Sequence, residues 1–79
     1  MNILDYSLLL YMSYEEAVKV SAYRHRSKLL ASSDWTQMPD SPLSAELKQA
    51  WVIYRQELRD ITSQSGFPSD IEWPTVPSN

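Results

Sequence analysis

The single histidine of the 79-residue chain, His25, is the side chain best suited to moving protons at neutral pH. It stands in the basic run 24–28, "RHRSK", and no acidic residue lies at a helical spacing from it to orient the ring. Acid–base or nucleophilic catalysis usually needs such a partner. The pattern therefore predicts an ordinary helix histidine rather than a catalytic base.

The carboxylates that fall in expected caps and turns show no metal-ligand spacing; they are Asp34, Asp40, Asp60, Asp70 and Glu72. One glycine is too few for a glycine-rich phosphate loop. The absence of cysteine excludes disulfides, thiolate metal sites and cysteine nucleophiles. We therefore predict that the chain is not an enzyme, with no catalytic residue, no metal and no cofactor.

Charge and hydropathy give no case for nucleic acid or membrane as a partner. The formal net charge is −3, and positive charge at 24–28 also suits a helix end, where it complements the helix dipole. The apolar run Leu8–Met12 is much shorter than the roughly 20 residues that span a bilayer. These features predict a soluble, intracellular, single small domain.

Protein binding is the chemistry that the side chains favour. Three Trp, five Tyr and one Phe are many aromatics for this length, and Trp, Tyr and Arg dominate binding hot spots. The candidate anchors are Trp35, Trp51, Tyr54, Arg55, Arg59, Phe67 and Trp73, with Leu9 and Tyr11 of the N-terminal segment. The alternative for these aromatics is that they form the core of the domain, above all for Trp51 and Tyr54, which sit mid-stripe on a helix.

Two helices are expected to position these residues. Ser13 and Glu16 match a capping box, and no Pro or Gly follows up to Ala31, which predicts a helix at about 14–31. One face of it, roughly 80° wide, carries Tyr14, Val18, Ala22, His25 and Leu29. Ser44 is the expected N-cap of a second helix at about 45–63. Its apolar stripe, about 100° wide, carries Leu47, Ala50, Trp51, Tyr54, Leu58 and Ile61.

The connections complete an all-α antiparallel helical hairpin over 13–66. Pro39 and Pro42 exclude a helix between the two, and Asp34 is expected to accept backbone N–H groups in an Asx turn, with Trp35 folded over the open end. Gly66 is expected to end the second helix in the left-handed conformation. Residues 67–79 are proline-rich and predict an extended strap. Residues 1–12 form an apolar N-terminal arm that fits a strand, a helical turn or a partner-bound segment.

Several rare segments follow one another in an order that resembles a known family. They are SDWTQ at 33–37, YRQ at 54–56, LRDI at 58–61, GFP at 66–68 and WP at 73–74, together with Leu29-Leu30, Pro39-Asp40, Leu43 and Ala50-Trp51. Over about residues 24–77 the chain resembles the C-terminal signature of the bacteriophage tail assembly chaperones. The resemblance implies a non-enzymatic phage protein that transiently binds a tail or tail-fibre protein in the host cytoplasm.

A second hypothesis is a small phage regulator that binds and modulates a host protein. The arm from Ile3 to Met12 would then choose the target together with the aromatic helix face, because it is too apolar to leave comfortably in water. The same arm suits a third packing element or a self-association surface. Since two helices bury little surface by themselves, a homo-oligomer or a larger partner is also expected.

Overall fold

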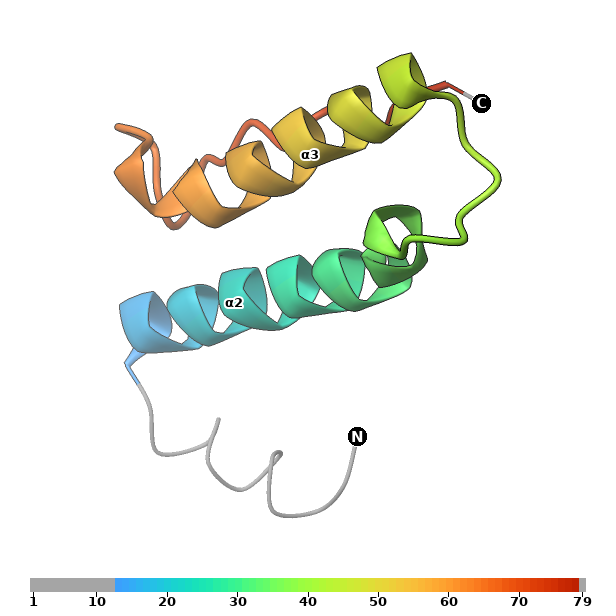
Figure 1. Cartoon of the computed structure of the whole chain (residues 1–79). Coiled ribbons are helices and arrows are strands. Elements are labelled where there is room, and N and C mark those ends of the chain that lie inside the picture. Colours follow the sequence, from blue (N-terminus) through green and yellow to red (C-terminus); the bar gives the residue numbers. More distant parts are fainter. Residues whose placement is uncertain (1–12, 79) are drawn as a thin grey trace, which may run out of the picture.

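The computed structural model describes residues 13–78, which form two antiparallel helices joined by a corner (Figure 1). The helix α2 spans Tyr14–Ser32 and α3 spans Ala45–Arg59. Two short 3₁₀ helices follow them directly, η1 at Asp34–Gln37 and η2 at Asp60–Ser63. Residues 13–78 contain no β-strand, so the predicted all-α hairpin is confirmed. The predicted arm, with Leu9 and Tyr11, lies outside the described residues.

Serine caps set the starts of both helices. The Ser13 hydroxyl oxygen accepts from the Glu16 backbone N–H at 3.1 Å and donates to the Glu16 carboxylate, also at 3.1 Å. In α3 the Ser44 hydroxyl accepts from the Leu47 N–H at 3.2 Å. Each cap satisfies a backbone donor that the first turn would otherwise leave unpaired. The capping box differs in one detail, because Glu16 bonds the Ser13 hydroxyl rather than its backbone N–H.

The second helix ends in two steps. Its α-helical part stops at Arg59, and the chain then tightens into η2 through Ser63. Such 3₁₀ turns are common at helix ends because they satisfy carbonyl groups that have no α-helical partner. The predicted end near Ser63 therefore corresponds to the end of η2.

Gly66 serves a different purpose from the one predicted. It does not have a positive φ, so the expected left-handed conformation is wrong. Its carbonyl accepts from the Asp70 N–H at 2.7 Å, closing a tight loop over 66–70. A Cβ added to Gly66 would overlap the Asp70 carbonyl oxygen. Glycine is needed here for close backbone approach rather than for a left-handed turn.

Replacing Gly66 by alanine is expected to lower the free energy of unfolding by about 1–2 kcal/mol, because the added methyl group forces the 66–70 loop apart. Urea denaturation followed by circular dichroism measures this loss. Ser65→Ala, at an exposed neighbouring position, is the matched control and should change stability little. An unchanged midpoint for Gly66→Ala would contradict the crowding argument.

The core lies between the helices at the middle of α3. Trp51, Tyr54 and Leu58 are the buried residues of its central cluster, with the Trp51 and Tyr54 rings edge to face at 5.4 Å. The partly buried side chains that pack against this cluster are Leu29, Leu30, Leu43 and Trp73. Burial raises the pKa of the Tyr54 phenol above its ordinary value, because the charged form is poorly solvated there. Trp51 and Tyr54 thus belong to the core, which was the alternative to a role as binding anchors.

Candidate protein-binding site

The segment that follows η2 runs back along α3 (Figure 1). Residues 71–78 have no helical or strand structure. The Gln64 side chain holds this segment at two points: its Nε2 donates to the Glu72 carbonyl at 2.8 Å and its Oε1 accepts from the Glu72 N–H at 2.9 Å. The Trp73 ring packs on the core cluster and lies edge-on to the His25 ring, with centroids 4.6 Å apart. The segment is therefore fixed to both helices.

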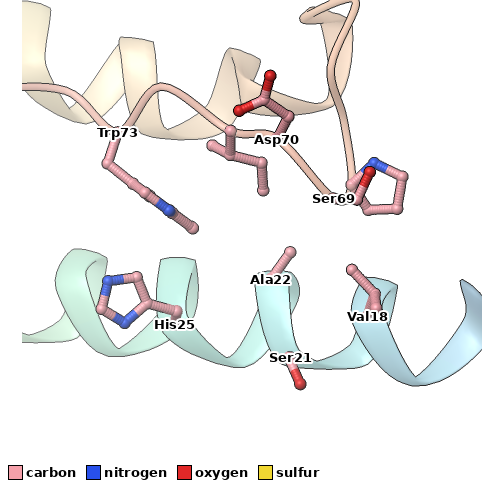
Figure 2. Close-up of a pocket in the computed structure, with 9 residues that line it drawn as sticks. Val18, Ser21, Ala22, His25, Ser69, Asp70 and Trp73 are labelled. Carbon is pink, nitrogen blue, oxygen red and sulfur yellow. The ribbon is translucent and has the colours of Figure 1, made fainter. Parts of the chain in front are cut away.

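A groove remains between α2 and this segment (Figure 2). Its larger hollow, about 440 Å³, is lined by Val18, Ser21, Ala22, His25, Pro68, Ser69, Asp70, Ile71 and Trp73. A second hollow of about 370 Å³ is lined by Tyr14, Glu15, Val18, Phe67, Pro68 and Ser69. Because three residues line both hollows, the two form one continuous groove, which we call the α2 groove.

The two walls of the α2 groove carry apolar side chains beside polar ones. The α2 wall carries Tyr14, Val18, Ala22 and His25, which belong to the helix face identified in the sequence. Figure 2 shows Val18 and Ala22 pointing toward the C-terminal segment, whereas Ser21 points away from it. The opposite wall carries Phe67, Pro68, Ile71 and Trp73. Such a groove suits apolar side chains of a peptide or a protein segment.

Phe67 and Trp73 are thus the two predicted anchors that line the α2 groove. The Phe67 ring also contacts Tyr23, with centroids 5.8 Å apart. The sequence predicted that both lie in an extended strap, but it did not single out Val18, Pro68 or Ile71 as site residues. The periodicity of α2 was the signal for Val18, and Pro68 stands in the GFP segment that carries the family resemblance.

Arg55 has a structural role at the corner. Its side chain is only 12% exposed; Nη1 donates to the Leu30 carbonyl and to the Ser33 hydroxyl, each at 2.7 Å, and Nη2 pairs with the Asp34 carboxylate at 2.9 Å. These contacts attach the C-terminal end of α2 to α3. Asp34 therefore contacts a guanidinium group, instead of closing the Asx turn that the sequence suggested.

Buried hydroxyl groups complete this corner. The Ser33 hydroxyl donates toward the Leu29 and Leu30 carbonyls, and the Thr36 hydroxyl donates to the Ser33 carbonyl at 2.6 Å. Ser33 and Thr36 are both buried. Buried polar groups need partners of this kind. No residue pattern indicated that these two small residues stabilise the corner.

The other two candidate anchors lie outside the α2 groove. Trp35 is 43% exposed, and its ring lies 6.2 Å from that of Trp51, so it covers the core while keeping much of its surface in solvent. Arg59 is exposed, and its backbone carbonyl accepts from Arg26 Nη1 at 3.2 Å. The structure therefore divides the predicted residues among the core, the corner and the groove.

Within residues 13–78 no three His, Asp or Glu side chains come together as a metal site would require. None of the helices there has the length and apolar character needed to cross a membrane.

The fold and the groove together define a small helical-hairpin protein with an open surface groove. Its sequence matches the family model of the phage tail assembly chaperone protein over residues 19–78, so the chain belongs to that family. The resemblance seen in the sequence is thereby confirmed. Comparison with curated proteins and with solved structures gives no match.

Membership of this family assigns the chain a role in phage tail assembly. The family is described as a chaperone, a description that suggests a non-enzymatic role and implies protein partners such as tail components.

Proposed function

We propose that the chain acts as a chaperone by transiently holding an apolar segment of a tail or tail-fibre protein in the α2 groove, within the host cytoplasm. The observation that carries the proposal is the continuous groove from Tyr14 to Trp73, whose two walls present Val18, Phe67 and Ile71 to a client. Tyr14 at one end of it is 83% exposed, so the folded chain leaves apolar surface there uncovered.

The size of the groove suits transient binding. Burying one Val, Leu, Ile or Phe side chain contributes about 1.5–3 kcal/mol. Two or three such side chains in the groove would be largely offset by the cost of association, about 4–15 kcal/mol. The net affinity is then modest, which a chaperone needs if it is to release its client.

Trp35 is an exposed candidate anchor and offers a second surface, but it lies at the corner and lines none of the hollows described here. The groove presents several apolar residues from two chain segments and is therefore favoured. The regulator hypothesis depends on residues 1–12, outside the described range, and no contact among the described residues favours it.

The test uses Val18→Gln, because Val18 lines both hollows of the groove. Glutamine is a good helix former, so the change should leave α2 intact while placing an amide against the client. The tagged full-length chain is purified from infected cells, retained phage tail proteins are identified, and the affinity of the purified tail protein is measured. We expect Val18→Gln to weaken that affinity at least about tenfold.

Val52→Gln is the matched control: Val52 is 42% exposed on α3 and lines none of the hollows. It should bind the tail protein as tightly as the natural sequence, and circular dichroism should show both variants folded. Equal losses in the two variants, or no loss in Val18→Gln, would remove the groove as the binding site. Failure to retain any tail protein would count against the proposed function itself.

A further inference from the structure

Charge is segregated along the chain. All seven Lys and Arg residues stand at or before Arg59, whereas residues 60–79 contain Asp60, Asp70 and Glu72 with no basic residue. This acidic part of the chain supplies one whole wall of the α2 groove.

The surroundings of that wall are acidic on both sides. Glu15 lines one end of the α2 groove, and Asp70 lines its larger hollow. Two further hollows adjoin the same segment; their carboxylates are Glu57, Asp60 and Glu72 in one and Asp70 and Glu72 in the other. No Lys or Arg lines any of these four hollows.

The position of Asp70 shows how this charge would act. In Figure 2 its carboxylate points away from α2, so this negative charge lies beyond the C-terminal segment and not between the two walls. We call the carboxylates of Glu15 and Asp70, which border the groove, its rim. Exposed rim charges act over about 10 Å at moderate salt. A partner residue emerging from the groove would therefore be within their reach.

Two basic side chains of the helices are engaged elsewhere. Arg55 pairs with Asp34 at the corner. Arg26 bonds the Arg59 carbonyl and lies 5.1 Å from the centre of the Tyr23 ring. Neither guanidinium group lines the four hollows.

We infer that the α2 groove binds a client segment in which apolar residues are bordered by lysine or arginine. The inference rests on the proposed function and names the kind of client segment that the groove selects. Apolar side chains supply the affinity, and the acidic rim supplies selectivity and faster association. From Tyr14 to His25 the α2 wall spans about three helical turns, which suits a client helix of similar length.

The test compares two fluorescent synthetic helical peptides with identical apolar positions, one carrying lysine and the other glutamate at the positions beside them. Binding to the full-length chain is followed by fluorescence anisotropy at low and at physiological ionic strength. We expect the lysine peptide to bind at least about tenfold more tightly at low salt, with the difference shrinking as salt screens the rim.

Variants that neutralise carboxylates test which charges cause the preference for the lysine peptide. The double variant Glu15→Gln, Asp70→Asn should reduce the preference for the lysine peptide severalfold. The control Glu46→Gln, which changes an exposed carboxylate on α3 outside the four hollows, should leave the preference unchanged. Equal reductions in both would show that net charge, not the rim, attracts the peptide, and would overturn the inference.

Equal binding of the two peptides, or tighter binding of the glutamate peptide, would also overturn it. If a tail protein is captured through Val18 while the peptides are not distinguished, the proposed function stands and the inference about charge fails. If neither peptide binds and the chain elutes as a dimer, a second copy occupies the groove, and the inference is wrong.

Discussion

The Trp51→Ala variant is expected to lose about 3–5 kcal/mol of unfolding free energy, enough to leave so small a domain largely unfolded at room temperature. Trp51 is 7% exposed and forms the buried cluster with Tyr54 and Leu58. Its removal leaves a cavity that two helices cannot close, because few other side chains are available to fill it. Circular dichroism and urea denaturation measure the loss directly.

Trp35→Ala is the control for Trp51→Ala, because it removes a tryptophan side chain that is not buried in the core. Trp35 is 43% exposed and its ring lies 6.2 Å from that of Trp51 at the edge of the core, so its removal should cost clearly less stability. A Trp51→Ala variant that stays folded with a native-like midpoint would show that Trp51 is not the centre of the core.

The second large effect is expected at the corner, where Arg55→Met should cost about 2–3 kcal/mol. Methionine keeps the apolar stem of the side chain but loses the three contacts to Leu30, Ser33 and Asp34. The C-terminal end of α2 would then be released from α3. Hydrogen exchange at the amides of residues 30–37 should report the opening of this corner.

Two further variants assign that loss to individual contacts. Asp34→Asn removes an exposed charge and should cost less than about 1 kcal/mol, as surface ion pairs do. Arg55→Lys keeps the charge but loses the planar fork, so its stability should lie between those of the natural protein and Arg55→Met. If Asp34→Asn costs as much as Arg55→Met, the ion pair dominates and the contacts to Leu30 and Ser33 matter little.

The helices were predictable because their signals are local. Ser13 and Ser44 are caps whose partners lie three residues away, and the stripe of α3 places Trp51, Tyr54 and Leu58 on one side of a helix. Local geometry and periodicity decide such features, whatever the rest of the chain does.

The corner and the loop at Gly66 were harder because their causes are contacts between residues far apart or between backbone atoms. Arg55 reaches across to Leu30, and its pairing with Asp34 replaced the turn expected from sequence. Gly66 is needed because the Asp70 carbonyl approaches it closely. No residue pattern in the sequence predicts this close approach. Only one wall of the groove could be predicted from the sequence. The α2 face followed from the helical periodicity, whereas the opposite wall is known only once the fold places residues 67–73 beside α2.

The central claim is that a tail protein binds the α2 groove. It is tested most directly by adding the tail protein captured from infected cells to the isotope-labelled full-length chain and following each backbone amide by NMR. The account predicts that the largest shifts fall at residues 14–25 and 67–73. Shifts confined to the exposed face of α3 around Val52 and Ile53, or to the corner around Trp35, would contradict it.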